Sequence, residues 1–198
     1  MSRAPRKRLS PEESRKMALE AARILLVENG PQGVTLKAVA ARIDRTHANV
    51  LHHFGTAADL HRELAKYMAS HVCQSISDAI HARRVGEATP RDVGDLVFDA
   101  FDQGGAAALS SWAALSRNTD TLEPILASIR SVVEEFSPDC DARELARISH
   151  LLVLWALGDA LMGEQLSNAL DLPRSTARDV AESTLKRWFE EDVFRIGA

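Results

Sequence analysis

Residues 45–53 concentrate side chains that can bind the bases of a nucleic acid. The segment reads Arg45-Thr46-His47-Ala48-Asn49-Val50-Leu51-His52-His53. An arginine can donate a bidentate pair of hydrogen bonds to guanine, an asparagine can pair in the same way with adenine, and an alanine is small enough to meet the methyl group of thymine. The histidines can donate to bases or to phosphate. For each of these residues the alternative is an ordinary solvated surface position.

A short helix must hold these side chains, because a helix that enters the major groove presents its first residues to the base edges. Two short segments with helical periodicity are separated by a break at Asp44 and Arg45. Such a pair of two-turn helices is typical of a helix-turn-helix. Upstream, Ser10-Pro11-Glu12-Glu13 has the form of a helix-starting capping box. Helices are therefore expected at residues 11–29, 35–43 and 46–53, and a long helix is expected from about residue 57.

The rest of the chain also reads as helices, because apolar residues recur every three or four positions and no alternating β-branched run occurs. Helices are expected near residues 90–103, 106–117, 121–136, 141–170 and 174–195. The predicted fold class is all-α. The longest apolar run, Leu151 to Gly158, is too short to span a bilayer core of about 30 Å. The basic N-terminus is followed by no apolar stretch, so we do not expect a secretory signal.

The stretch from Ala21 to Leu60 resembles the N-terminal domain of the TetR/AcrR family of bacterial transcriptional regulators. The matching residues are Ala21-Ala22-Arg23-Ile24-Leu25, Gly30, Gly33-Val34-Thr35-Leu36, Val39-Ala40, His53-Phe54-Gly55-Thr56 and Asp59-Leu60. The resemblance implies an N-terminal three-helix helix-turn-helix DNA-binding domain and a C-terminal helical domain that binds an effector and dimerises. We place the first domain at residues 1–56, with a basic flexible tail at 1–9, and the second at 57–198.

The resemblance and the residue types together assign the DNA contacts. These are Thr35, Lys37, Arg45, Thr46, His47, Ala48, Asn49, His52 and His53. The sequence departs from the family pattern at the turn, where Asp44 replaces a glycine and Arg45 an apolar residue. Aspartate tolerates the left-handed conformation, so the turn is expected to survive. Leu51 replaces a tyrosine and Ala57 a lysine, so two common DNA contacts are missing.

Charge divides the chain in the same way. Residues 1–66 hold 12 Lys+Arg and 7 Asp+Glu, whereas residues 67–198 hold 12 Lys+Arg and 21 Asp+Glu. A basic head on an acidic body suggests that only the head meets a polyanion, the alternative being chance clustering. The tail residues Arg3, Arg6, Lys7 and Arg8 either follow a minor groove or stay solvated. Four head histidines (His47, His52, His53 and His61) predict a DNA affinity that rises as pH falls from about 8 to 6.

One helix reads only a few base pairs, so useful specificity requires a dimer on a palindrome. The resemblance places the dimer interface in helices 141–170 and 174–195. Gly158 is small enough to allow close helix approach. The interface candidates are Leu151, Leu154, Gly158, Leu161, Val180, Ala181, Leu185 and Trp188. The alternative is a monomer in which helix 141–170 is fully buried.

The C-terminal domain should hold an apolar pocket with few polar groups for a small, hydrophobic effector. The candidates are Phe98, Phe101, Trp112, Arg117, His150, Trp155 and Asp159. Asp159 lies on an apolar stripe, so its carboxylate should be paired or solvated. Its partner could be Arg117, a bound cation or a second chain, or the residue could form an ordinary helix-packing salt bridge. The two tryptophans could equally be core residues.

Together these observations predict a cytoplasmic, homodimeric transcriptional repressor that a small molecule releases from double-stranded DNA. The alternative is a DNA-binding protein of the same fold without such an effector, controlled by a protein partner or acting structurally. No metal or cofactor is expected, and no catalytic motif indicates an enzyme. Cys73 and Cys140 lack metal-ligand spacing, and inert reduced thiols are a simpler interpretation than a redox switch.

Overall fold

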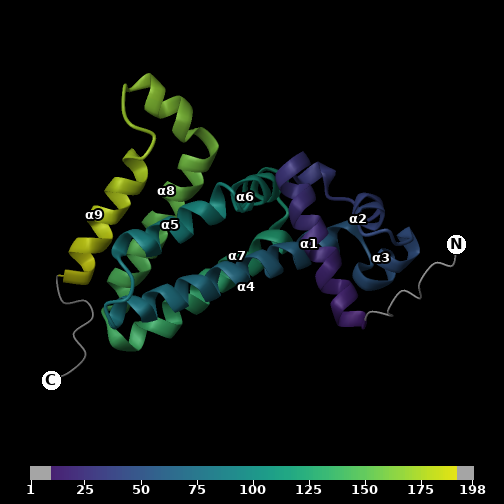
Figure 1. Cartoon of the computed structure of the whole chain (residues 1–198), viewed down its shortest axis with the longest axis horizontal. Coiled ribbons are helices and arrows are strands. Elements are labelled where there is room, and N and C mark those ends of the chain that lie inside the picture. Colours follow the sequence, from purple (N-terminus) through teal and green to yellow (C-terminus); the bar gives the residue numbers. More distant parts are fainter. Residues whose placement is uncertain (1–9, 191–198) are drawn as a thin grey trace, which may run out of the picture.

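A computed structural model describes residues 10–190, and these residues form helices with no strand among them (Figure 1). The α-helices are α1 (Pro11–Asn29), α2 (Leu36–Arg42), α3 (His47–Phe54), α4 (Ala57–Arg84), α5 (Pro90–Phe101), α6 (Ala106–Leu115), α7 (Thr119–Phe136), α8 (Ala142–Ala169) and α9 (Thr176–Glu190). Short 3-10 turns, η1 (Pro31–Gly33) and η2 (Ser137–Asp139), precede α2 and α8. The all-α prediction is confirmed. The basic tail and the predicted end of the last helix lie outside the described residues.

Side-chain caps explain where several helices begin. At α1, the Ser10 hydroxyl accepts the Glu13 backbone N–H at 3.1 Å, and the Glu13 carboxylate accepts the Ser10 N–H at 2.7 Å. Thr89 and Asp92 form the same reciprocal pair at α5. These two capping boxes satisfy backbone donors that have no partner within the helix, so the sequence itself marks both starts.

The N-terminal unit is built on one core to which α1–α3 contribute. Leu26, Val39 and Val50 are at most 1% exposed in this core. Leu60 and Leu64 of α4 are fully buried in the same cluster. The core of the N-terminal unit therefore continues beyond residue 56, into the first turns of α4.

The second half of α4 belongs to a separate core that it shares with α5, α7, α8 and α9. Ile80 of α4 is buried here with Phe98, Phe136 and Leu185. Figure 1 shows α4 and α7 running side by side along the length of the body. Helix α4 is thus one rigid element with its two ends in two cores.

Helix α6 also joins the two cores. Leu109 is fully buried in the N-terminal core, whereas Ala107 is buried in the second core. Gly105, which precedes α6, has a φ of 80°, and a Cβ there would lie 3.3 Å from side-chain atoms of Leu26 and Val27 on α1. This close approach places the start of α6 directly against the C-terminal end of α1.

Helix α8 is long and apolar. Its 28 residues include an 18-residue window with a mean hydropathy of 1.4, so length and composition alone would let it cross a membrane. One such helix is weak evidence for a membrane span, because the core helix of a soluble protein can have the same length and hydropathy. Leu145, Ile148 and Leu152 of α8 are buried in the second core.

Asp159 of α8 pairs with Arg174 and not with Arg117. Its Oδ1 accepts from Nη1 of Arg174 at 2.5 Å, and its backbone carbonyl accepts from Nη2 at 3.3 Å. Arg174 lies just before α9, so the pair fastens the α8–α9 connection to α8. Of the alternatives for Asp159, the structure therefore supports a salt bridge within the chain. Among residues 10–190 no group of side chains could hold a metal ion.

Gly163 supplies the space for this ion pair, since a Cβ there would lie 2.4 Å from Asp159 Oδ1 and 3.0 Å from Arg174 Nη1. Gly163→Ala is expected to lower the free energy of unfolding by about 1–3 kcal/mol, because it parts a buried carboxylate from its hydrogen-bond donor. Arg174→Ala should act through the same loss. In urea denaturation the double variant should therefore lose less than the two single losses added together. Full additivity would contradict this assignment.

Candidate nucleic-acid interface and effector cavity

The turn between α2 and α3 has the geometry of a helix-turn-helix. Asp44 adopts a left-handed conformation with a φ of 51°. The backbone N–H of Arg45 donates to the carbonyl oxygen of Ala40 at 2.9 Å and holds the turn closed. The prediction that aspartate can replace the usual glycine here is confirmed.

Helix α3 turns its apolar side inward and its polar side outward. Val50 and Phe54 are buried in the N-terminal core. The exposed or half-buried candidates on α3 and its cap are Arg45, Thr46, His47, Ala48, Asn49, His52 and His53. On α2, Thr35 and Lys37 are exposed. The hydroxyls of Thr46 and Thr35 cap α3 and α2, accepting backbone N–H groups at 3.3 and 3.1 Å.

The cations on this side of the N-terminal unit differ in whether they are already neutralised. Arg42 pairs with Glu28, and Arg62 pairs with Asp59. No residue in the described range 10–190 forms an ion pair with Lys37 or Arg45. These two charges are consequently available to an external anion.

Arg15 of α1 clamps the end of α3. Its Nη1 donates to the carbonyl oxygen of His53 at 2.7 Å, and its Nη2 pairs with Glu63 of α4 at 2.5 Å. Its guanidinium carbon also lies 4.8 Å from the centre of the Phe54 ring. One side chain thereby joins α1, α3 and α4. Sequence reasoning missed Arg15, because its partners are 38 and 48 residues away.

His61 does not lie on the proposed DNA surface. It is buried, its Nε2 lies 3.0 Å from the Val34 carbonyl oxygen, and its ring packs edge-on against Trp112. Burial lowers the pKa of His61, and burial also lowers the pKa of the half-buried His53. The predicted pH dependence of DNA affinity therefore cannot rest on His61.

His61 predicts a pH dependence of stability instead. The unfolded chain takes up a proton near the ordinary histidine pKa of 6.5, whereas burial holds the folded pKa lower. The unfolded state therefore binds more protons below pH 6.5, and the free energy of unfolding should fall as pH drops from about 7.5 to 5.5. His61→Gln should reduce this slope in urea denaturation and leave the part that comes from His53, whose pKa burial also lowers. The carboxylates of Glu20 and Asp59 have lowered pKa values and titrate below that window. An unchanged slope would refute the assignment.

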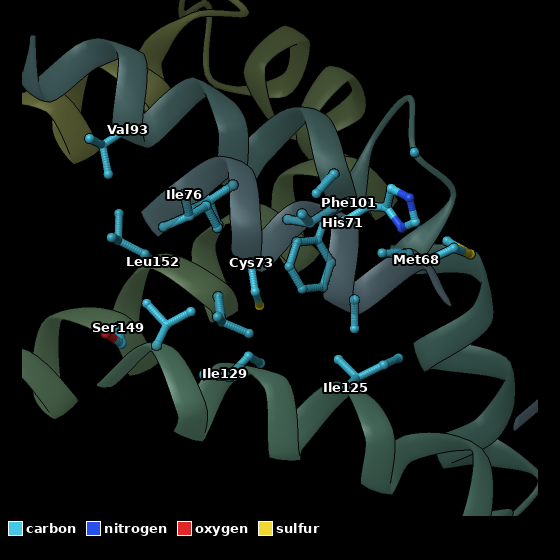
Figure 2. A pocket seen from close by; sticks show the side chains of 18 of the residues that line it. Met68, His71, Cys73, Ile76, Val93, Phe101, Ile125, Ile129, Ser149 and Leu152 are labelled. Carbon is cyan, nitrogen blue, oxygen red and sulfur yellow. The ribbon is translucent and has the colours of Figure 1, made fainter. Parts of the chain in front are cut away.

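The body contains an apolar cavity of about 330 Å³. Its lining follows α4 from Ala65 to Ile80, about 22 Å at 1.5 Å per residue. Figure 2 shows Cys73 of α4 and Ile129 of α7 pointing into the same space. Further apolar side chains in the lining are Met68, Val72, Ile76, Val97, Phe101, Leu152, Leu185 and Trp188. The volume and the apolar lining are typical of a small-molecule site.

One end of this cavity reaches the N-terminal unit. Glu20 and Arg23 of α1 line it together with Tyr67 and His71 of α4. In Figure 2, Met68 and His71 lie toward this end, whereas Val93, Ser149 and Leu152 lie toward the other. The Arg23 guanidinium holds the pKa of the Glu20 carboxyl below its ordinary value, so Glu20 is ionised.

Of the seven effector-site candidates, only Phe101 lines the cavity. Phe98 is buried in the core beneath Arg178, Trp112 packs on His61, and Trp155 is a partly buried core residue. Arg117 and His150 are exposed, and Asp159 is held by Arg174. Cys73 also lines the cavity, although it was not among the predicted effector-site residues. Burial raises the pKa of its thiol. The apolar periodicity of helix α4 was the signal that could have revealed it.

The dimer candidates divide into an exposed group and a buried group. Leu154, Leu161 and Val180 are each about half exposed, and a Cβ on exposed Gly158 would meet no atom within 4 Å. Leu151 is half-buried. The structure corrects the assignment of Ala181, Leu185 and Trp188, which are at most 5% exposed in the core of their own chain. Helix α9 must turn these residues inward to close the second core.

The matched region in a comparison with protein families coincides with the N-terminal unit. Residues 18–64 match the model of the bacterial regulatory proteins of the tetR family. The N-terminal unit of this chain is therefore similar to the DNA-binding domain of tetR-family regulators. The match ends at Leu64 of α4, so it includes the whole helix-turn-helix and the first turns of α4, where Leu60 and Leu64 are buried in the same core. Proteins of this family are generally non-enzymatic regulators that bind DNA.

Solved structures extend this likeness to the fold of the whole chain. The multidrug-binding protein EbrR, crystallised with imidazole, aligns with a TM-score of 0.64 at 17% identity, covering 94% of this chain and 97% of EbrR. A putative transcriptional regulator from Pseudomonas aeruginosa PAO1 aligns with a TM-score of 0.57 at 19% identity, covering 95% of each chain. No curated protein matches the chain in sequence. At these identities the likeness concerns the fold alone.

Proposed function

We propose that this protein is a cytoplasmic transcriptional repressor of the tetR family that binds a palindromic operator as a homodimer and is released by a small apolar molecule. The proposal rests on one observation: α4 contributes residues to both hydrophobic cores. Its first turns complete the core beneath α3, and its later turns line the 330 Å³ cavity. A molecule in the cavity therefore contacts the element that supports the DNA-binding surface. A body with such a cavity favours this function over a regulator without an effector.

In this proposal α3 enters the major groove with its N-terminal end leading. Arg45 donates a bidentate pair to guanine, Asn49 pairs with adenine, and Ala48 meets a thymine methyl group. The remaining candidates, Thr35, Lys37, Thr46, His47, His52 and His53, contact phosphate or base edges and fix the register of the helix. Arg45 and Lys37 bring charges that no described residue neutralises.

The second chain packs against the exposed apolar side of α8 and against α9. Leu154 and Leu161 face outward one turn on either side of Gly158, which allows close helix approach. Two identical chains then present two α3 helices to half-sites about 10 base pairs apart. Dimerisation supplies the specificity that one short helix lacks.

Release follows from a shift between two dimer states. An effector that binds one spacing of the two α3 helices more tightly than the other moves the population toward that spacing. Helix α4 carries the change directly, and α6 carries it through its contact with α1 at Gly105. The name of EbrR, a multidrug-binding protein of the same fold, is consistent with an apolar effector.

Selection from a pool of random duplexes tests the DNA-binding part of this proposal. The full chain is expected to enrich a palindrome with two half-sites, and each half-site should contain a guanine and an adenine read by Arg45 and Asn49. Footprinting of the enriched sequence should show two protected segments on one face of the duplex. Enrichment of no sequence, or of a single unrepeated half-site, would count against the proposal.

A further inference from the structure

Among residues 10–190, the charged groups that line the cavity lie at one of its ends. Glu20 and Arg23 are the charged lining residues, and both come from α1 of the DNA-binding unit. Tyr67 and His71 of α4 lie beside them, and the Tyr67 and His71 rings are 4.3 Å apart. The cavity is therefore asymmetric, with an apolar body inside the second core and a polar end against the first.

The hydrogen bonds at this end occupy the oxygens of Glu20 and leave one donor group of Arg23 unused. Oε1 of Glu20 accepts from Nε and Nη2 of Arg23 at 3.1 and 2.6 Å. Oε2 accepts from Arg23 Nε at 3.1 Å and from the Tyr67 hydroxyl at 3.3 Å. Nη1 of Arg23 donates to no acceptor within residues 10–190. The charged pair at the polar end can thus still donate hydrogen bonds through the Arg23 guanidinium.

We propose that the cavity binds amphipathic carboxylates, with the apolar body of the ligand along α4 and its carboxylate on Nη1 of Arg23. This inference rests on the proposed function, since it names the ligand class of the same cavity. A cationic head group would have to displace Arg23 from Glu20, whose oxygens already accept four hydrogen bonds. A carboxylate needs only the donor that is still available, and charge-assisted hydrogen bonds of this kind are the stronger ones.

The position of Arg23 gives the carboxylate a direct route to the DNA-binding unit. Arg23 holds Glu20, and Glu20 in turn accepts from Tyr67, which ties α1 to α4. A ligand carboxylate competes with Glu20 for Arg23 and repels the Glu20 carboxylate. Binding therefore loosens the tie between α1 and α4. An uncharged ligand of the same shape fills the apolar body but leaves this tie in place.

Three probes with one apolar chain and different head groups test the inference. Decanoate, decanol and decyltrimethylammonium are titrated below their micelle concentrations into the full-length protein, and binding is measured by calorimetry. Decanoate is expected to bind at least about tenfold more tightly than decanol, because hydrogen bonds to a charged group are stronger than those to a neutral one. Arg23→Gln should remove that preference and leave decanol binding unchanged. Glu20→Gln should strengthen decanoate binding, because it frees Arg23 and removes a repelling charge.

The results separate this inference from the proposed function. Decanoate binding no tighter than decanol overturns the carboxylate assignment but leaves an apolar effector cavity intact. Tighter binding of the cation that is lost in Glu20→Gln overturns it in favour of a cationic ligand. Binding of none of the three probes overturns the inference and the cavity's role together. With the selected DNA present, decanoate should weaken DNA binding in the unmodified protein and not in Arg23→Gln.

Discussion

Replacing Leu154 and Leu161 together by glutamate is expected to convert the protein into a monomer and to abolish tight operator binding. Each side chain is about half exposed on α8, and both flank Gly158. Placing two carboxylates from each chain in a close apolar interface would bury unpaired charges, which costs several kcal/mol. Sedimentation velocity should then show the mass of one chain at micromolar concentration.

The matched control is Leu115→Glu on α6. Leu115 is 86% exposed, more than either α8 leucine, so its replacement adds an acidic group without altering the proposed interface. This variant should remain dimeric and keep its affinity for DNA. A Leu154→Glu, Leu161→Glu protein that stays dimeric would show that the second chain, if any, packs elsewhere.

Replacing Arg15 by alanine is expected to lower DNA affinity at least about tenfold, although Arg15 is a positioning residue and not a proposed DNA contact. The variant releases the His53 carbonyl, the Glu63 carboxylate and the Phe54 ring at once. The end of α3 then loses its attachment to α1 and α4. If α3 is loosely held, part of the free energy of DNA binding is used to order it, and the affinity falls.

Fluorescence anisotropy with the selected duplex measures this effect, and circular dichroism shows whether the helices remain. Arg62→Ala is the matched control, because Arg62 also forms an ion pair, but only with Asp59 on the same helix surface. That variant should bind DNA nearly as well as the unmodified protein. Equal losses in Arg15→Ala and Arg62→Ala would indicate a general effect of removing positive charge.

Local signals made the helix-turn-helix predictable. The capping box joins Ser10 and Glu13, three positions apart, and the turn at Asp44 is closed by a bond between Arg45 and Ala40, five positions apart. Both interactions are therefore local enough to be predicted from the sequence. The inward side of α3 follows from its apolar spacing for the same reason. Contacts between residues that lie within one or two helical turns of each other can be predicted from the sequence.

The cavity and the long-range contacts were not accessible in this way. Which residues line a space between several helices depends on how each helix is rotated, and the aromatic character that singled out Phe98 and Trp112 says nothing about rotation. The Asp159–Arg174 pair joins a helix to the connection that follows it, across 15 residues. Likewise, Leu185 and Trp188 fit either an interface or a core by spacing alone, and only the packing of α9 on α5 and α8 decides between them.

Anisotropy in a salt series, with the selected duplex and a scrambled duplex, shows whether α3 reads base sequence. Arg45→Ala and Asn49→Ala should each reduce the preference for the selected duplex by about 1–3 kcal/mol per half-site and barely affect binding to the scrambled one. Lys37→Ala should weaken binding to both duplexes and reduce the salt dependence. If the Arg45 and Asn49 variants lose affinity equally for both duplexes, α3 contacts phosphate only and does not read base sequence.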